Sequence, residues 1–515
     1  MSHASAEPLE LNGAGLTLGA LAEVVEGRHV RLSAVTLERL AAARAAVIQA
    51  AGGSEAVYGV NTGFGPLRDR RVDAARLAEL QLNLVRSHAA GVGPLFSSGQ
   101  VRGAMALLIN CLAHGNSGIN PSIVQLIVDF LNNSIHPIVP SQGSLGASGD
   151  LAPLAHVALC LVGEGDVEFG GARMPVHEAL SKTGLSPVTL GPKDGLSLVN
   201  GTHFLTAVGA LAAVEAADVI KSADIAAALH VEASLSSIRP YSEEVLMLRP
   251  HPGALQTAAN VRRLVEGSGL MRSHENCGEV QDAYSVRCVP QVHGAVRQAW
   301  MHAVQVLEVE MNAVTDNPVW VGGQFVSAGN FHGEPCALAL DYLTLGLVEL
   351  GNISERRTER LLNPALSRGL SAFLASDPGV ESGLMLAHYT AAALASENKS
   401  LAFPPSADTI PTGANQEDHV SMGATSARRL DSVIGNLSSI IAVELLAGAR
   451  AVRMRVEERG TQPGSGTAAA QSAVESIAPH LPGDRSPSED IERVSRAVRR
   501  GELARYVEER MGELA

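Results

Sequence analysis

Aromatic residues are scarce in this sequence. Only 3% of its 515 residues are Phe, Trp or Tyr, although 46% are hydrophobic. Aliphatic side chains must therefore fill most of the core, and the chain is long enough for a large core or for several domains. Long blocks of like charge are also missing, and the formal net charge is -14. Nucleic acid and anionic membranes attract clustered Lys and Arg, so we expect neither as a partner and expect a small molecule instead.

Cysteine is rare as well, and its spacing is uninformative. The five cysteines are Cys111, Cys160, Cys277, Cys288 and Cys336. An odd number without any C-x-x-C pair predicts neither a disulfide framework nor a zinc site. The N-terminus has no basic start followed by an apolar run, as a secretory signal would. We therefore expect a cytoplasmic protein with no bound metal.

The late apolar stretch at residues 433–452 is the strongest candidate for a membrane span. It is interrupted by Asn436, Glu444 and Arg450, which are costly in hydrocarbon. A buried helix explains the stretch better, and no membrane partner is expected.

Long stretches of the chain carry apolar residues at helical spacing. They are residues 37–51, 74–90, 101–114, 202–236, 296–314, 336–362 and 430–456. Several exceed the usual helix length of about 10–14 residues, and their Ala-rich faces allow close packing. Extended segments are few: residues 134–139, and a hairpin at 319–326 with a Gly-Gly turn.

These patterns predict a mainly α fold, in which long central helices form a bundle and a smaller N-terminal region carries loops. No repeat or linker marks a domain boundary. The best candidate lies near Asn200, where the first very long helical stretch begins, and would divide the chain into residues 1–200 and 201–515.

A glycine-rich loop leads directly into an apolar helical pattern at residues 143–156. Asp150 could cap the helix, whose positive pole would then point at Ala147-Ser148-Gly149. By itself the segment is equally compatible with an ordinary helix start or an anion-binding loop. It lacks the lysine of a P-loop and the G-x-S-x-G of serine hydrolases.

This loop, together with the segment Tyr58-Gly-Val-Asn-Thr-Gly-Phe-Gly, resembles the aromatic amino acid ammonia-lyases and aminomutases. The resemblance extends over nearly the whole chain. In that family an Ala-Ser-Gly tripeptide cyclises without external enzyme or metal, and loss of two waters leaves a methylidene-imidazolone, an electrophilic alkene. The resemblance implies that Ala147, Ser148 and Gly149 form this cofactor here. Gly149 would supply an unhindered backbone nitrogen, and Ser148 the hydroxyl that is lost.

An electrophile is required because the β-proton of an amino acid is not acidified by an adjacent carbonyl. The electrophile could take up the substrate amine, which improves the leaving group, or attack the ring, which acidifies the β-proton. The sequence leaves both routes open. By resemblance Tyr58 is the base, which requires its pKa to fall from about 10 through neighbouring positive poles. Without the resemblance, Tyr58 would be assigned to an ordinary structural loop.

Further segments resemble the family's binding stretches. Gln281, Tyr284 and Arg287 are spaced so that, on a helix, all could face one cavity. Arg287 would bind the substrate carboxylate with its paired donors. Asn200, Gln281 and the catalytic Tyr284 would hydrogen-bond the electrophile, the amine or the carboxylate. Phe331 would pack near the electrophile; alone, it would be assigned to the core.

The substrate is indicated by the pair Ser87-His88 and by Glu417. This combination resembles the histidine-specific branch, because His88 and a carboxylate can address the two imidazole nitrogens, whereas a buried carboxylate beside a phenyl ring would be costly. The implied reaction releases ammonia from L-histidine to give trans-urocanate, the entry to histidine degradation. A metal site at Glu417, Asp418 and His419 is disfavoured, because neighbours on a helix point in different directions.

Other functions remain as alternatives. The chain could be a tyrosine or phenylalanine ammonia-lyase or a 2,3-aminomutase with the same electrophile, or a non-catalytic helical scaffold. The resemblance also implies a homotetramer whose active sites are shared between subunits. Two positions depart from the family pattern: Ala283 replaces a common proline and Gly413 a common serine.

Overall fold

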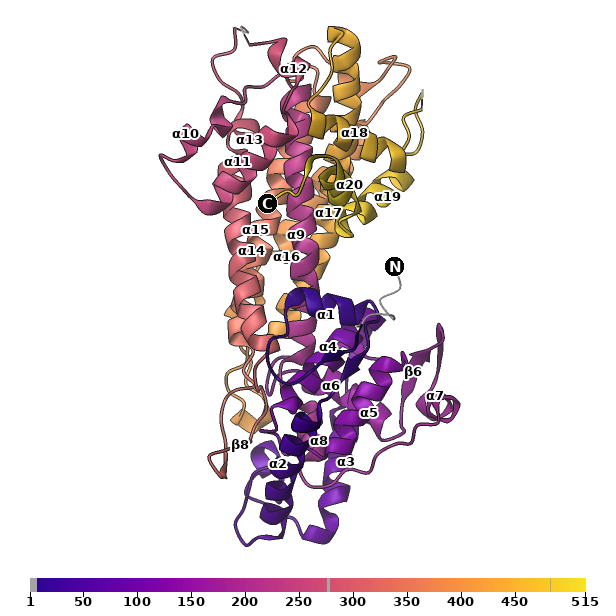
Figure 1. Ribbon diagram of the computed structural model, residues 1–515, viewed down its shortest axis with the longest axis vertical. Coiled ribbons are helices and arrows are strands. Elements are labelled where there is room, and N and C mark those ends of the chain that lie inside the picture. The colour runs from indigo at the N-terminus through magenta and orange to yellow at the C-terminus, as the bar shows by residue number, and fades with distance from the viewer. Residues whose placement is uncertain (1–6, 276–277, 482) are drawn as a thin grey trace. The chain divides into compact units, whose positions relative to one another are not determined.

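The computed structural model describes residues 7–275, 278–481 and 483–515, and these are mainly helical (Figure 1). Helices α1 to α20 contain most of the described chain, whereas each strand is only two to four residues long. The predicted fold class, mainly α with long central helices, is confirmed.

Chain contacts divide the protein into two compact units. The first contains residues 1–211, 304–341 and 404–428, and the second contains residues 212–303, 342–403 and 429–515. The division of the chain near Asn200 stays a prediction.

The longest helices match the longest apolar stretches of the sequence. They are α9 (His203–Ala233), α14 (Val289–Met311), α15 (Glu334–Leu362) and α17 (Gly423–Arg459). By length and composition alone, α9, α15 and α17 could cross a membrane. Inside the protein, however, 72%, 67% and 72% of their most apolar windows are buried, so packing accounts for most of this apolar surface.

The first unit holds the shorter N-terminal helices and all the strands. Its helices are α1 (Leu18–Val25), α2 (Ala34–Gly52), α3 (Leu77–His88), α4 (Ser98–Ala113), α5 (Pro121–Asn132), α6 (Leu151–Leu161), α7 (Val176–Thr183) and α8 (Asp194–Val199). The strands are β1 (Leu9–Glu10), β2 (Val30–Arg31), β3 (Val92–Leu95), β4 (His136–Pro137), β5 (Pro140–Gln142), β6 (Asp166–Phe169), β7 (Ala172–Pro175), β8 (Val319–Val321) and β9 (Gln324–Val326). Among the strands of the described residues, only β1 and β2 pair in parallel; β3–β5, β4–β6–β7 and the predicted hairpin β8–β9 are antiparallel.

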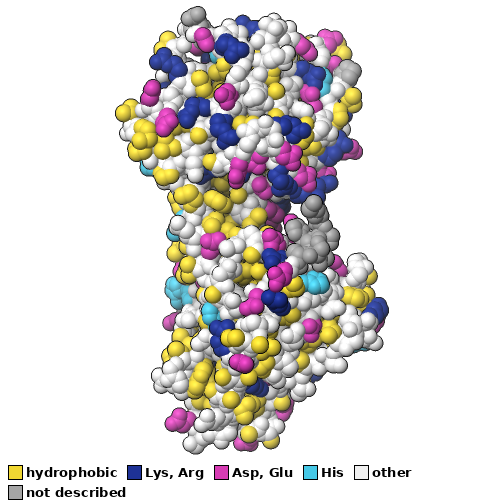
Figure 2. All heavy atoms as spheres, in the orientation of Figure 1, with side chains coloured by type: hydrophobic (Ala, Val, Ile, Leu, Met, Phe, Trp, Pro, Cys, Tyr) yellow, Lys and Arg dark blue, Asp and Glu magenta, His cyan; other side chains and the backbone are white. Residues whose placement is uncertain are grey.

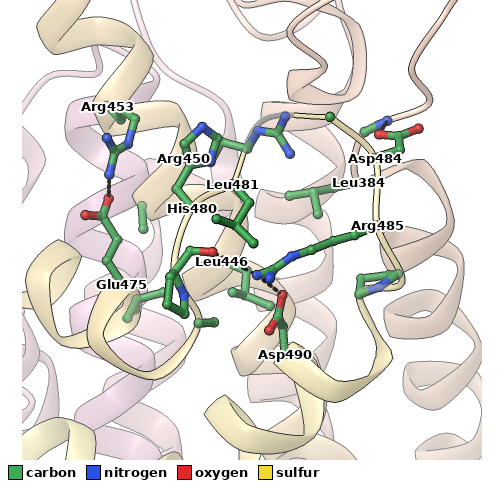
Figure 3. A pocket seen from close by; sticks show the side chains of 17 residues that line it. Leu384, Leu446, Arg450, Arg453, Glu475, His480, Leu481, Asp484, Arg485 and Asp490 are labelled. Carbon is green, nitrogen blue, oxygen red and sulfur yellow. Dashed lines mark hydrogen bonds and ion pairs between the residues drawn. The ribbon is translucent and has the colours of Figure 1, made fainter.

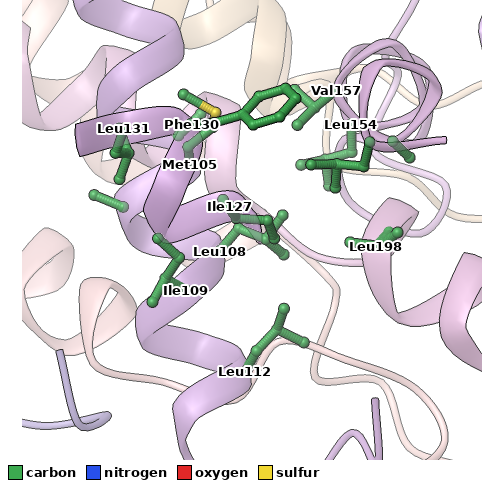
Figure 4. Close-up of a cluster of buried hydrophobic side chains, with 14 of the residues drawn as sticks. Met105, Leu108, Ile109, Leu112, Ile127, Phe130, Leu131, Leu154, Val157 and Leu198 are labelled. Atoms are coloured by element: carbon green, nitrogen blue, oxygen red, sulfur yellow. The ribbon is translucent and has the colours of Figure 1, made fainter. Parts of the chain in front are cut away.

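An aliphatic cluster positions the loops of the first unit (Figure 4). Side chains of α4 and α5, among them Met105 and Phe130, belong to the same buried cluster as Leu154 of α6 and Leu198 of α8. Burying one such side chain stabilises the fold by about 1.5–3 kcal/mol. The cluster thereby fixes the start of α6, after Gly149, and the end of α8, before Asn200.

The second unit contains the remaining helices together with the C-terminal parts of α9, α15 and α17 and the N-terminal part of α14. The remaining helices are α10 (Glu243–Leu246), α11 (Pro252–Leu264), α12 (Gly269–Arg272), α13 (Tyr284–Arg287), α16 (Met385–Leu401), α18 (Ser465–Ile477), α19 (Ser488–Arg499) and α20 (Glu502–Met511). On the face drawn in Figure 2, acidic and basic side chains are interspersed and do not form a large patch of one sign.

A fully buried ion pair joins two helices of the second unit. Arg357 of α15 donates to both carboxylate oxygens of Glu444 on α17, at 2.5 and 2.9 Å, and Ser354 Oγ donates to the same carboxylate at 2.6 Å. Arg357 Nη1 also lies 3.2 Å from Nε2 of the buried His293. Glu444, which interrupts the apolar stretch of α17, is therefore satisfied inside the protein.

Candidate active site

The loop before α6 bends at three glycines with positive φ, Gly143 (133°), Gly146 (86°) and Gly149 (71°). Asp150 occupies the N-cap position of α6 but makes no side-chain bond to that helix. Its carboxylate instead accepts from the backbone N–H of Leu205 in α9 at 2.8 Å and from Ser144 Oγ at 3.1 Å. Asp150 therefore takes the predicted N-cap position of α6, but its side chain bonds to the first turn of the more distant helix α9 and ties the loop to it. Burial raises the pKa of Asp150 to about 6.

The tripeptide backbone lies tightly against Gly201. Gly201 N donates to Ser148 O at 3.1 Å, and Asp150 N donates to Gly201 O at 2.7 Å. A Cβ added to Gly149 would lie only 2.1 Å from Gly201 O, so no other residue fits there. Ala147 and Gly149 are bridge partners across a single residue, which means that the backbone folds back on itself. A backbone that folds back at this tripeptide is compatible with ring closure between Ala147 and Gly149.

Asn200 follows α8 and faces the tripeptide. Ser148 Oγ donates to Asn200 Oδ1, and Asn200 Nδ2 donates to Asp316 Oδ1 at 2.9 Å and to Asn317 O at 2.7 Å. Asn200 is 1% exposed. The structure thus brings together Ser148 and Asn200, as the sequence predicts.

Within the loop that carries Tyr58, the tyrosine hydroxyl accepts a hydrogen bond from the loop's own backbone. Gly65 N donates to Tyr58 Oη at 3.1 Å, and the Phe64 ring meets the Tyr58 ring edge-on at 6.5 Å. Burial raises the pKa of Tyr58; the bond from Gly65 lowers it, the charge of Glu417 raises it, and the charge of Arg68 lowers it. The net direction is upward, so the expectation that neighbouring positive poles lower this pKa is wrong for the chain by itself. Partial burial outweighs them.

His88 and Glu417 lie near Tyr58. His88 is the last residue of α3, and its Nδ1 lies 3.1 Å from Ser87 Oγ. Burial lowers the pKa of His88, and the charge of Glu417 raises it. The same carboxylate also raises the pKa of Tyr58, so Glu417 is close enough to act on both groups.

The segment around Glu417 is not helical, contrary to the expectation used to weigh a metal site. A short 3-10 turn (Gly413–Asn415) precedes it, and Glu417 forms an isolated bridge with Thr412, whose Oγ1 donates to Glu417 Oε2 at 3.0 Å. A Cβ on Gly413 would come within 2.8 Å of the Glu417 carboxyl, so the departure at Gly413 leaves room for that group. Within residues 7–275, 278–481 and 483–515, no cluster of three or more His, Cys, Asp or Glu is arranged to hold a metal ion.

Gln281, Tyr284 and Arg287 belong to the second unit. Helix α13 begins only at Tyr284, because Ala283 is extended, so the expected helical face that includes Gln281 is wrong. The Arg287 guanidinium lies over the Tyr284 ring at 4.6 Å, and Tyr284 is 71% exposed. Arg287 Nε is buried without a hydrogen-bond partner, which leaves a donor for an anion.

Phe331 is half-buried in the first unit, between β9 and α15. Its predicted contact with the electrophile stays a prediction.

Sequence reasoning missed Gln81, a fully buried residue of α3. Its Nε2 donates to Gly59 O at 3.1 Å, and its Oε1 accepts from Leu196 N at 3.0 Å. Gln81 thus joins the Tyr58 loop to α8, which ends just before Asn200. A polar residue on the buried face of an apolar helix was the available signal.

A hollow in the second unit is lined by other residues (Figure 3). Arg485 pairs with Asp490 at 2.5 Å, and Arg453 pairs with Glu475. Arg450 and His480 also line it, and no predicted site residue does.

Comparison with known proteins gives a consistent result. The sequence pattern of the family "Aromatic amino acid lyase" matches residues 16–476. The chain is similar to a histidine ammonia-lyase of Sorangium cellulosum, with 48% identity over 98% of this chain and 100% of the relative, and to one of Natranaerobius thermophilus, with 45% identity over 98% and 100%.

Solved structures agree with the sequence relatives. The fold is similar to tyrosine aminomutase from Streptomyces globisporus (TM-score 0.93, 38% identity, 99% of this chain and 100% of that one) and to histidine ammonia-lyase from Trypanosoma cruzi (TM-score 0.90, 39% identity, 98% and 96%). With the match over residues 16–476 and relatives at 45–48% identity over nearly the full length, the chain belongs to the aromatic amino acid lyase family.

Proposed function

We propose that this protein is an ammonia-lyase that converts L-histidine to trans-urocanate and ammonia, the first step of histidine degradation. The observation that carries the substrate assignment is the placement of Glu417, whose charge acts on both Tyr58 and His88. Relatives named histidine ammonia-lyase share 45–48% of the sequence over nearly its full length, which supports the same substrate. An imidazole has two ring nitrogens, and His88 and Glu417 provide polar partners for them.

The cofactor that we propose is a methylidene-imidazolone formed from Ala147, Ser148 and Gly149, without any external cofactor. The folded-back tripeptide and the close contact of Gly149 with Gly201 support this assignment. The group would supply an electrophilic alkene that activates the substrate for loss of ammonia. Asn200 would hold the Ser148 hydroxyl in place through the hydrogen bond between these two side chains.

Tyr58 is the proposed base for the β-proton, and Arg287 the proposed partner of the substrate carboxylate. Tyr58 lies beside Glu417, and Arg287 has an unpartnered buried N–H. Gln281 and Tyr284, on the same segment as Arg287, would bind the amine or the carboxylate. Phe331 would pack against the electrophile.

A homotetramer with shared active sites is the proposed assembly. In the second unit, α15 exposes Tyr342 and Leu345, α16 exposes Leu386 and Tyr389, and Phe403 is exposed just after α16. Exposed apolar surface of this kind is typical of subunit interfaces. A neighbouring copy could also supply positive charge that lowers the pKa of Tyr58, which the chain's own groups leave raised. Light scattering should give the mass of four chains; the mass of one chain would contradict this assembly.

The cytoplasm is the proposed compartment. Cys111, Cys160, Cys288 and Cys336 are free thiols, as a reducing compartment favours, and Cys277 lies outside the described residues.

The substrate assignment is tested by a comparison of three amino acids. Purified protein is given L-histidine, L-tyrosine or L-phenylalanine, and ammonia and the conjugated acrylate are measured. We expect product from histidine, and a loss of at least about tenfold in kcat/KM when Glu417→Gln removes the charge, as for loss of one charged hydrogen bond. Product from tyrosine, or a β-amino acid, would instead favour the aminomutase alternative suggested by the 38% identical structure. Silence on all three substrates would favour a scaffold.

A further inference from the structure

Two buried charged residues stand behind Asn200. Lys193 Nζ donates to Asp316 Oδ2 at 2.6 Å and to Ser197 Oγ at 3.0 Å, and the Lys193 and Asp316 side chains are 0% and 1% exposed. The other carboxylate oxygen, Asp316 Oδ1, accepts from Asn200 Nδ2 at 2.9 Å and from the backbone N–H of Asn317 at 2.6 Å. A continuous chain of polar contacts therefore runs from Lys193 through Asp316 and Asn200 to Ser148.

This series of polar contacts determines which way the Asn200 amide points. The oxygen and nitrogen of an amide occupy nearly the same volume, so only hydrogen-bond partners distinguish its two orientations. Both hydrogens of Asn200 Nδ2 meet acceptors, Asp316 Oδ1 and the backbone oxygen of Asn317. The Lys193 ammonium has donors only, so it needs an acceptor, and Asp316 Oδ2 provides one. A flipped amide would place its oxygen against two acceptors.

We propose that Lys193 and Asp316 are positioning residues that lock the Asn200 carbonyl toward Ser148 and thereby promote cyclisation of the tripeptide. The inference rests on the proposed function, because it concerns formation of the same electrophile. Neither residue touches the reacting atoms: Asp316 acts through Asn200, and Lys193 acts through Asp316.

The bond changes show why the Ser148 hydroxyl must be oriented. The Gly149 nitrogen bonds to the Ala147 carbonyl carbon, and the Ala147 oxygen leaves as water with the N–H protons of Gly149 and Ser148. The Ser148 hydroxyl then leaves as a second water with the Ser148 Cα proton, and a Cα–Cβ double bond forms. While Asn200 Oδ1 holds the hydroxyl proton, the oxygen keeps its lone pairs free for the proton with which it departs.

The main test is Asp316→Asn, which preserves shape but changes the partner of Asn200. Lys193 has only donors to offer, so it would take the oxygen of the new amide. The amide NH₂ would then face the backbone N–H of Asn317, whose bond is lost, and Asn200, where it favours the flipped orientation. Ser148 would meet a donor in place of an acceptor. We expect cyclisation, followed by intact mass as the loss of two waters after synthesis, to slow by about tenfold or more, the factor that corresponds to one lost hydrogen bond.

Two further variants separate orientation from stability. Ser197→Ala removes a partner of Lys193 but leaves the contact with Asp316, so it should cyclise at the wild-type rate even if it unfolds at a lower temperature. The exchange Asn200→Asp with Asp316→Asn keeps the net charge and returns an acceptor to Ser148. It should recover part of the cyclisation rate, and it decides the question if Asp316→Asn alone does not fold.

The outcomes distinguish this inference from the proposed function. A wild-type protein that is not two waters lighter would overturn both. A cyclised wild type with an equally fast Asp316→Asn variant, or a folded exchange variant that does not cyclise, would overturn only the role of Lys193 and Asp316.

Discussion

Replacing Gly149 by alanine is expected to block cyclisation and to destabilise the protein locally. Gly149 has a φ of 71°, a region that costs an alanine about 1–2 kcal/mol. The new Cβ would also lie 2.1 Å from Gly201 O, where ordinary contact begins at 3.4 Å. Gly201 would have to move, which weakens its hydrogen bonds with Ser148 and Asp150, each worth about 0.5–1.5 kcal/mol. The expected destabilisation is about 2–5 kcal/mol.

A matched control is available at Gly184. It has nearly the same φ, 72°, but a Cβ there meets nothing within 4 Å. Gly184→Ala should therefore cost only the conformational term, about 1–2 kcal/mol, and should cyclise normally. Intact mass reports the loss of two waters, and thermal unfolding reports stability. The reasoning would be refuted by a Gly149→Ala protein that loses both waters and unfolds at the same temperature as Gly184→Ala.

Three other perturbations follow from the structure. Tyr58→Phe removes the proposed base and should lower kcat by about 10²- to 10⁴-fold while the tripeptide still cyclises; an unchanged kcat would rule out this role. Glu444→Gln leaves the buried Arg357 uncompensated and should destabilise the fold by about 3–5 kcal/mol in urea unfolding, whereas the exposed Glu349→Gln should change it by less than about 0.5 kcal/mol; similar values for both would contradict the account. Burial raises the pKa of Asp150 from 3.8 to about 6, so the folded state holds an extra proton between these values and stability falls as pH rises through that window, by up to about 3 kcal/mol. Asp150→Asn should flatten this fall, and an unchanged pH dependence of unfolding would argue against it.

The long helices could be predicted from the sequence because their apolar periodicity extends over many turns. Helices α15 and α17 contain the predicted stretches 336–362 and 430–456, and α9 covers most of 202–236, since one buried face is enough to specify a helix. Short segments were harder. The spacing of Gln281, Tyr284 and Arg287 is compatible with a helix, but an extended Ala283 delays the start of α13.

The parts of the site that escaped prediction depend on distant contacts. Asp150 precedes α6 in the sequence, yet its carboxylate bonds to α9. The pKa of Tyr58 rises because of burial, which no local motif reveals. Asp316 and Lys193 meet only after folding, because they are 123 residues apart in the sequence. The motifs therefore predicted that Asn200 lies at Ser148, but not which residues orient Asn200.

The most direct test of the central claim compares wild-type protein with Ser148→Ala in the presence of L-histidine. Ser148 supplies the hydroxyl whose loss would create the alkene, and alanine has none to lose. The account predicts that the wild type forms urocanate and ammonia in equal amounts and that Ser148→Ala, although folded, forms essentially none. Equal rates for the two proteins, or no urocanate from the wild type, would contradict it.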